Sequence, residues 1–188
     1  DPQSGEITPP SAFIPSAERY DIMPKIDRWV IEHFLAHLSL YPQLPQKRFS
    51  INLSGSSIND DAFISFLTHQ LAQHHIDPKR LCFEITETVA ISNLKKAADF
   101  IIELKKLGCC FALDDFGSGM SSWTYLKQLP VDYLKIDGNL VKETPTDRVS
   151  CAMLESINYI GHVMGLKTIA EYVENPSILE KAQELSID

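Results

Sequence analysis

Two adjacent aspartates, Asp114 and Asp115, are the residues best suited to catalysis in this sequence. They end an apolar run that begins at Phe111, and a Gly-Ser-Gly turn follows at residues 117–119. This pattern is typical of a buried strand that ends in a turn. Neighbouring carboxylates repel each other and are costly to bury without a cation. A divalent metal ion is the simplest such cation, and an exposed acidic turn is the alternative for this stretch alone.

Other expected strands also end in a polar residue. The pattern predicts strands at 49–53, 81–85, 111–115, 133–136 and 167–170, which alternate with helices at 60–75, 93–107, 123–129 and 147–164 and a last helix capped by Asn175. This alternation predicts a parallel sheet, whose strands share one carboxyl edge. At or next to that edge we expect Asn52, Glu84, Asp114, Asp115, Lys135 and Glu171. The sequence therefore predicts one shared site.

The part of the chain before these units carries weaker signals. Residues 1–15 are rich in Pro, Ser and Gly, which predicts a loop. A helix is expected at 24–40, with a core face made of Ile26, Trp29, Val30, Phe34 and Leu38. His33 and His37 are spaced for zinc chelation, but the glutamate of the zinc-protease helix is missing, which argues against a metal role.

Composition narrows the class of protein. The 188 residues are 44% hydrophobic, enough for one sizeable core, and one domain is the default expectation. The net charge of −8 argues against duplex DNA or an anionic membrane as the main partner. No apolar run has the length of a membrane span. The cysteines lack the paired spacing of a zinc site; they are Cys82, Cys109, Cys110 and Cys151. Three of them lie in apolar, strand-like runs, which predicts buried thiols in a reducing compartment.

The donor types at the strand ends indicate a particular chemistry. Carboxylate and amide oxygens suit Mg²⁺ or Mn²⁺ rather than zinc. Adjacent carboxylates can serve two ions, which together activate water for phosphoryl displacement. Lys135 could orient that water or offset charge on phosphorus. The structural alternatives are an ion pair of Lys135 with Asp137 or Asp114, and supporting or capping roles for Glu84 and Glu171.

Five motifs together carry a resemblance to a known family. They are Asn52-Leu53-Ser54, Phe83-Glu84-Ile85-Thr86-Glu87, Leu113-Asp114-Asp115-Phe116-Gly117-Ser118-Gly119, Leu134-Lys135-Ile136-Asp137 and Ala170-Glu171-Tyr172-Val173-Glu174. In this order they resemble the successive motifs of the EAL-domain family. The resemblance implies an α/β fold, a (β/α)8 TIM-like barrel of which this chain covers about five central units.

The resemblance also implies an activity and residue roles. EAL domains hydrolyse cyclic di-GMP to linear pGpG with two Mg²⁺ or Mn²⁺ ions. By resemblance the metal ligands would be Asn52, Glu84, Asp114 and Asp115, and Lys135 would hold the attacking water. Glu171 would be a base for that water or a ligand of the second metal. The same resemblance gives supporting roles to Asp137 and Glu174.

A loop and an interface follow from the same likeness. Glu87 would anchor the loop after Asp115, which includes Phe116, Gly117, Ser118 and Gly119. This loop and its neighbouring helix would form a homodimer interface. We expect a cytoplasmic domain within a longer parent protein. That parent could also carry a sensor domain, a diguanylate cyclase domain or a membrane anchor. No DNA partner and no direct membrane contact are expected.

The chain departs from the family pattern in three places. The Glu-Ala-Leu stretch, with one more metal ligand, and the late Gln-Gly segment are both absent, so residues 1–188 are expected to be a single incomplete EAL domain. Tyr172 replaces a frequent glycine, and strand alternation predicts that it points away from Glu171. A catalytically inactive EAL domain that binds cyclic di-GMP or docks a protein is the alternative function. An unrelated Mg²⁺-dependent lyase fits the acids and the lysine but not the ordered motifs.

Overall fold

The computed structural model describes residues 7–42, 44, 47–118 and 123–188. Its contacts divide the chain into two compact units. The first unit holds Asp1–Pro45 and Leu53–Ile76, and the second holds Gln46–Asn52 and Asp77–Asp188. All of the strand ends singled out above lie in the second unit.

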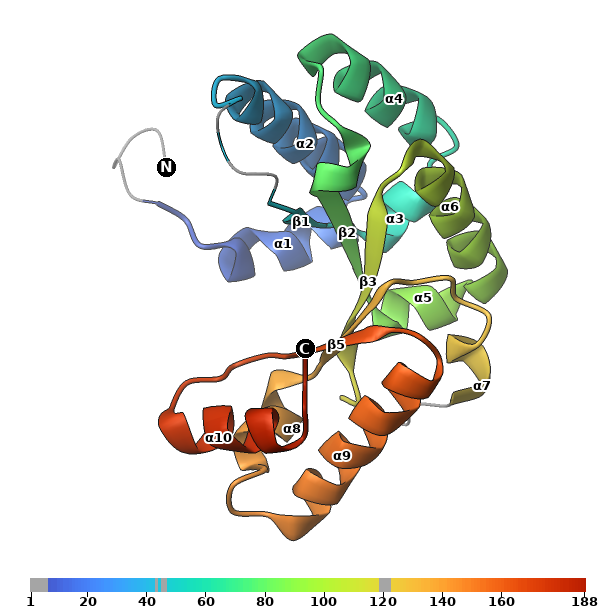
Figure 1. The fold of residues 1–188 in the computed structure, drawn as a ribbon. Helices are drawn as coiled ribbons and strands as arrows, with labels where there is room; N and C mark the ends of the chain where they lie inside the picture. The colour runs from blue at the N-terminus through green and yellow to red at the C-terminus, as the bar shows by residue number, and fades with distance from the viewer. Residues whose placement is uncertain (1–6, 43, 45–46, 119–122) are drawn as a thin grey trace. The chain divides into compact units, whose positions relative to one another are not determined.

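The first unit is helical (Figure 1). Its elements are α1 (Pro10–Arg19), α2 (Met23–Ser39), α3 (Gly55–Ile58) and α4 (Phe63–His74). Helix α2 contacts each of the other three. The loop expected at 1–15 is wrong from Pro10 onward, because Pro10 starts α1 at a position where proline is tolerated.

The core face of α2 also differs from the expected one. Trp29 is 58% exposed and Val30 is 39% exposed, whereas Ile31 and Leu35 are fully buried. The buried positions of α2 are Met23, Asp27, Ile31, Leu35 and Leu38. Apolar residues occur almost all round this helix, and the true face contains an aspartate. Leu38 is buried as expected, and Ile26 and Phe34 are half-buried, so the predicted face is wrong at Trp29 and Val30.

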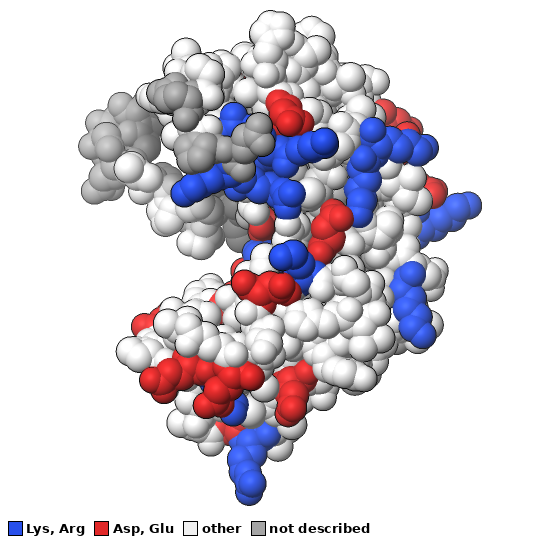
Figure 2. All heavy atoms as spheres, in the orientation of Figure 1, with Lys and Arg blue, Asp and Glu red and all other residues white. Residues whose placement is uncertain are grey.

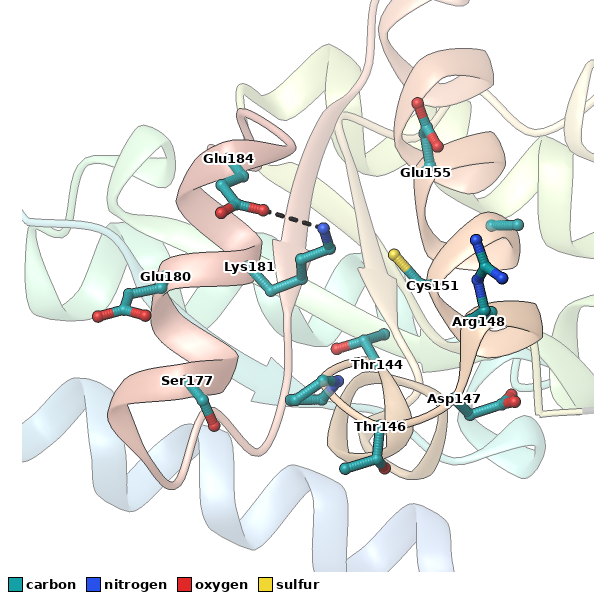
Figure 3. Close-up of a pocket in the computed structure, with 12 residues that line it drawn as sticks. Thr144, Thr146, Asp147, Arg148, Cys151, Glu155, Ser177, Glu180, Lys181 and Glu184 are labelled. Atoms are coloured by element: carbon teal, nitrogen blue, oxygen red, sulfur yellow. Dashed lines mark hydrogen bonds and ion pairs between the residues drawn. The ribbon is translucent and has the colours of Figure 1, made fainter.

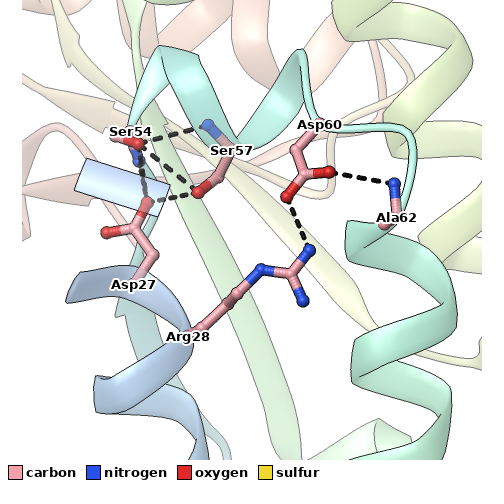
Figure 4. A network of polar contacts seen from close by, with 6 residues as sticks. All are labelled: Asp27, Arg28, Ser54, Ser57, Asp60 and Ala62. Atoms are coloured by element: carbon pink, nitrogen blue, oxygen red, sulfur yellow. Dashed lines mark hydrogen bonds and ion pairs between the residues drawn. The ribbon is translucent and has the colours of Figure 1, made fainter. Parts of the chain in front are cut away.

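Asp27 is buried because three donors satisfy one of its carboxylate oxygens (Figure 4). Its Oδ2 accepts hydrogen bonds from the Ser54 backbone N–H at 3.0 Å, the Ser54 hydroxyl at 2.7 Å and the Ser57 hydroxyl at 2.7 Å. Arg28 forms an ion pair of 2.6 Å with Asp60 beside this network, which holds the pKa of Asp60 below its usual value. These contacts join α2 to the turn that begins α3.

The second unit is a parallel five-stranded sheet with helical connections (Figure 1). The strands are β1 (Phe49–Asn52), β2 (Leu81–Thr86), β3 (Cys110–Phe116), β4 (Tyr133–Ile136) and β5 (Lys167–Ala170), and they lie in the order β1-β2-β3-β4-β5. Parallel strands arranged in chain order with helical crossovers are the arrangement of a (β/α) barrel wall. The α/β prediction is confirmed.

The connecting helices follow the expected alternation with several short additions. They are η1 (Pro78–Arg80), α5 (Glu87–Ser92), α6 (Leu94–Leu107), α7 (Trp123–Leu126), α8 (Gly138–Glu143), α9 (Arg148–Val163) and α10 (Pro176–Glu184). Gly108 ends α6 with a φ of 105°, and the Asn175 side chain caps α10 by accepting from the Ile178 N–H, as the sequence predicted. The short helices α3, α5 and α8 were not predicted, because four to six residues are too few to show a helical spacing of apolar residues.

The core of the second unit lies between the sheet and these helices. Phe83, Phe111, Leu113 and Phe116 are fully buried on β2 and β3. Helix α6 packs against β3, and α9 packs against β4 and β5. This packing holds the strands rigidly enough to fix the directions of the polar side chains at their ends.

All four cysteines are free thiols. Cys82 and Cys109 are buried, and burial raises the pKa of each thiol to about 12, with the neighbouring Cys110 adding to the shift. Cys110 and Cys151 are partly exposed. Among the described residues, no helix combines the length and the apolar character that crossing a membrane requires.

Candidate active site

A bulge in β3 brings Asp114 and Asp115 to the same site. Successive side chains of a regular strand point to opposite faces. Here the register with β4 shifts between Leu113 and Phe116, and Asp115 has a φ of 55°, in the left-handed region that aspartate tolerates better than most residues. One carboxylate oxygen from each of Asp114, Asp115 and Glu171 lies within 4.8 Å of the others. The irregularity converts two neighbouring residues into one cluster.

Lys135 lies at the centre of this cluster. Its Nζ donates to Glu84 Oε2 at 2.7 Å and to Asp114 Oδ1 at 2.8 Å, and it forms an ion pair with Glu171 Oε1 at 2.7 Å. The lysine side chain is 13% exposed. Carboxylates from β2, β3 and the end of β5 therefore converge on one ammonium group from β4.

Burial and neighbouring negative charge both shift the pKa values of the groups in this cluster. Burial raises the pKa of Asp115, and the charges of Asp114 and Asp137 raise it further. Burial also raises the pKa of Glu171, against a lowering hydrogen bond from Lys135. Burial alone would lower the pKa of Lys135, but its hydrogen bonds to carboxylates outweigh this effect and raise it. One ammonium group does not neutralise so many carboxylates, so the cluster is suited to a further cation.

Asn52 is the remaining strand-end residue of the expected set. It is the last residue of β1 and is paired in register with Glu84 of β2. Its side chain is exposed at this edge. The amide is therefore next to the cluster along the sheet edge.

Asp137 and Glu174 have different surroundings from the cluster. Asp137 is buried, and its Oδ1 caps α8 by accepting from the backbone N–H groups of Asn139 and Leu140. Glu174 is exposed and pairs with Lys142 at 3.2 Å. For Lys135, the ion-pair alternative is realised with Asp114 and not with Asp137.

Glu87 lies against the loop that follows Asp115. It is buried at the start of α5, where its Oε2 accepts from the Gly117 backbone N–H at 3.2 Å and its Oε1 accepts from the Tyr125 hydroxyl. Phe116 is fully buried and packs against Trp123, whereas Ser118 is exposed. Gly119 lies outside the described residues. These hydrogen bonds connect the start of α5 to the residue after β3 and to α7.

Tyr172 is the residue whose placement corrects the sequence analysis. Strand β5 ends at Ala170, and Tyr172 has a φ of 51°, so strand alternation does not extend to it. Tyr172 lines a hollow of about 500 Å³ together with Asp114, Asp115 and Glu171. The expectation that it points away from the site is therefore wrong.

A second hollow of about 500 Å³ lies between α9 and α10 (Figure 3). Cys151 of α9 and Lys181 of α10 line it, and Lys181 Nζ donates to Glu184 Oε2 at 2.9 Å. Figure 2 shows acidic side chains gathered over the part of the second unit that holds α8 and α10. This hollow contains none of the strand-end residues, so the acidic cluster remains the stronger candidate for chemistry.

The donor set fits hard divalent cations. Four carboxylates and one amide lie along a single sheet edge, and neither cysteine nor histidine is among the strand-end residues. Oxygen-only donor sets favour Mg²⁺ or Mn²⁺ over zinc. The raised carboxyl pKa values of Asp115 and Glu171 are those of groups that a metal ion would stabilise in the charged form.

Comparison with known proteins agrees with this geometry. The EAL domain family model matches residues 1–188. The chain is 44% identical over 185 residues to the cyclic di-GMP phosphodiesterase PdeB of Shewanella oneidensis, which covers 98% of this chain and 22% of that protein. It is 35% identical over 187 residues to PdeF of Escherichia coli, also a cyclic di-GMP phosphodiesterase, covering 99% of this chain and 25% of that protein.

A solved structure is similar throughout the chain. The structure described as PaMucR phosphodiesterase in complex with c-di-GMP has a TM-score of 0.91 and 29% sequence identity, and the match covers 100% of this chain and 76% of that one. The chain spans about a quarter of the length of the curated relatives. The family match, the ordered strand-end motifs and the parallel sheet agree, and the chain belongs to the EAL domain family.

Proposed function

We propose that this chain belongs to a metal-dependent phosphodiesterase that hydrolyses cyclic di-GMP to linear pGpG. The observation that carries the proposal is the convergence of Glu84, Asp114 and Glu171 on Lys135, with Asp115 in the same cluster. The relatives named as cyclic di-GMP phosphodiesterases support the choice of substrate.

The proposal assigns the metal site to the cluster. Asn52, Glu84, Asp114 and Asp115 would hold two Mg²⁺ or Mn²⁺ ions. When bound, the ions would supply positive charge for the phosphate and a lowered pKa for a water molecule. The hard oxygen donors and the raised pKa of Asp115 support this assignment.

Lys135 and Glu171 would act on water and phosphate. The Lys135 ammonium is held in the charged form by its carboxylate neighbours, so it can donate a hydrogen bond to the attacking water or to a phosphate oxygen. The raised pKa of Glu171 lies closer to neutral pH than that of an ordinary carboxyl group, which suits a general base. This shift and the place of Glu171 in the cluster support a role as base for the water, and ligation of the second metal ion is the alternative role.

The remaining residues would position these groups. Asp137 would fix the start of α8, directly after the strand that carries Lys135. Glu87 would hold the loop of Phe116, Gly117, Ser118 and Gly119 through its bond to Gly117. Glu174 would support the segment after Glu171 through Lys142.

A homodimer through this loop and α9 is part of the proposal. A Cβ at Gly117 would lie 3.1 Å from Ile157 of α9, so this part of the loop packs directly on that helix. Helix α9 exposes apolar side chains, with Val149 at 66%, Met153 at 44% and Val163 at 69%. Burial of such side chains favours association with a second copy. We also propose that residues 1–188 form one incomplete EAL domain, that the domain is cytoplasmic and that its parent protein carries further domains.

Hydrolysis of cyclic di-GMP by the protein that carries this chain tests the function. With Mg²⁺ or Mn²⁺ the product separated by liquid chromatography should be pGpG, and EDTA should stop its formation. Asp114→Asn should abolish turnover with a modest effect on folding, because it removes both a ligand and a repulsive charge. Binding of intact cyclic di-GMP without hydrolysis would overturn the enzyme proposal in favour of a receptor.

A further inference from the structure

Tyr172 is an unusual residue for its backbone conformation. Its φ of 51° lies in the left-handed region, which bulky aromatic residues rarely adopt. The side chain is nevertheless 59% exposed, so core packing does not explain a tyrosine at this position. It lines the hollow that also contains Asp114, Asp115 and Glu171. A strained and exposed aromatic residue beside a candidate catalytic cluster calls for a role toward a ligand.

The ring of Tyr172 is nonetheless held in place. A Cβ on Gly138 would lie 1.6 Å from Cδ2 of this ring, so the ring occupies the space that any other residue at position 138 would fill. Lys142 Nζ lies 4.2 Å from the ring centroid, and Lys142 is itself paired with Glu174 at 3.2 Å. The start of α8 therefore provides a seat for the ring and a cation for its π system. The aromatic surface is positioned before a ligand arrives.

We propose that Tyr172 is a specificity-determining residue whose exposed ring stacks on one guanine base of the substrate. The proposal rests on the proposed function, because a cyclic dinucleotide carries purine bases beside the phosphates that the acidic cluster would bind. Purines stack on aromatic side chains without needing a hydrogen-bonding partner. The hollow has room for a base beside the carboxylates, at about 500 Å³.

Equilibrium binding and hydrolysis of cyclic di-GMP by Tyr172 variants test this role. Stacking on an aromatic ring contributes about 1–3 kcal/mol per base, which corresponds to roughly a 5- to 150-fold change in Kd. Tyr172→Phe keeps the ring and should bind within about twofold of the wild type. Tyr172→Leu keeps apolar volume without a ring and should raise Kd and KM about tenfold or more, with kcat changed far less. Equal Kd values for the Tyr, Phe and Leu forms would overturn the inference.

Two further variants separate stacking from a structural role. Tyr172→Gly should lose the same affinity while the unfolding midpoint stays equal or rises, because glycine suits the left-handed backbone. Gly138→Ala should displace the ring and weaken binding in the Tyr172 protein, but should have little effect in the Tyr172→Gly protein. If the losses of affinity from Gly138→Ala and Tyr172→Gly were additive, the contact between position 138 and the Tyr172 ring would not position the ring. Tyr20→Leu, at a tyrosine that is 69% exposed in the first unit, is the matched control and should leave Kd unchanged.

The outcomes also distinguish the two proposals. A wild type that hydrolyses cyclic di-GMP, with Tyr172→Leu indistinguishable from it, would leave the function standing and remove the stacking role. A wild type that binds but does not hydrolyse would overturn the enzyme proposal, while the Kd series still decides the role of Tyr172. A wild type that neither binds nor hydrolyses would overturn both.

Discussion

Replacing Lys135 by methionine isolates the charge at the centre of the cluster. Methionine keeps most of the length of the side chain but removes the ammonium group. Three partners then lose their bond to it: Glu84 at 2.7 Å, Asp114 at 2.8 Å and Glu171 at 2.7 Å. The side chains of these carboxylates are only 8%, 13% and 22% exposed, so water replaces the lost partner poorly.

The expected loss of stability follows from this geometry. Removing one member of a buried ion pair costs about 3–5 kcal/mol. The partial exposure of Glu171 places Lys135→Met near the lower end, at about 3 kcal/mol in EDTA. A divalent ion at 100 times its Kd stabilises the folded state by about 2.7 kcal/mol, which is nearly the same amount. In the wild type the ammonium group occupies oxygens that a metal ion would use, so Mn²⁺ should stabilise the variant more than the wild type.

Urea unfolding in EDTA and in saturating Mn²⁺ measures both effects. The difference between the wild type and Lys135→Met should be large in EDTA and should shrink in Mn²⁺, while turnover in Mn²⁺ stays low because the hydrogen-bond donor is gone. Lys105→Met is the matched control. Its pair with Asp132 spans 2.7 Å, but the two side chains are 33% and 31% exposed, so its loss should be about 1 kcal/mol or less and insensitive to Mn²⁺. An equal loss for Lys135→Met in EDTA and in Mn²⁺ would refute the reasoning.

Three further outcomes are expected. Asp27→Ala leaves the Ser57 hydroxyl buried without its acceptor and should lower the free energy of unfolding by about 2–4 kcal/mol, with a smaller loss for Asp27→Asn. A loss below about 1 kcal/mol for the alanine variant would contradict a stabilising role for these hydrogen bonds. Glu87→Ala removes the acceptor for Gly117 and Tyr125, so limited proteolysis after Asp115 should quicken and kcat should fall together; Tyr125→Phe, which keeps the Gly117 bond, should change both less. Because the pKa values of Asp115 and Glu171 are raised, protons compete with a metal ion for these carboxylates at a higher pH than for ordinary carboxyl groups, and Mn²⁺ affinity measured by calorimetry should fall on acidification. In EDTA, protonation of the same two groups removes an unfavourable charge and so favours the folded state. A Mn²⁺ affinity that rises on acidification would exclude this linkage.

The sequence predicted those parts of the structure that depend on local signals. Strands β4 and β5 have the expected bounds, and Gly108 and Asn175 end and begin their helices as expected. These features arise from short apolar runs and from caps, whose physics involves only a few neighbouring residues. The placement of polar residues at the carboxyl edge then follows from parallel topology.

The remaining features depend on tertiary context. The buried face of α2 could not be predicted because it includes Asp27, whose hydrogen-bond donors are serines about 30 residues away in the sequence. The left-handed conformation of Asp115 interrupts strand alternation, and that of Tyr172 lies beyond the end of β5. Neither an Asp-Asp pair nor a tyrosine after a glutamate signals such a conformation in the sequence. The seat that Gly138 provides for Tyr172 links positions from two different connections. Such contacts become visible only once the strands are side by side.

Anomalous diffraction at the manganese edge tests the central claim most directly. Crystals of the protein that carries this chain, grown with MnCl₂, should show manganese density bonded to oxygens of Glu84, Asp114 and Asp115, with the Lys135 ammonium moved off at least one of the carboxylate oxygens that it now contacts. Manganese bound elsewhere, with all three Lys135 ion pairs intact, would contradict the account.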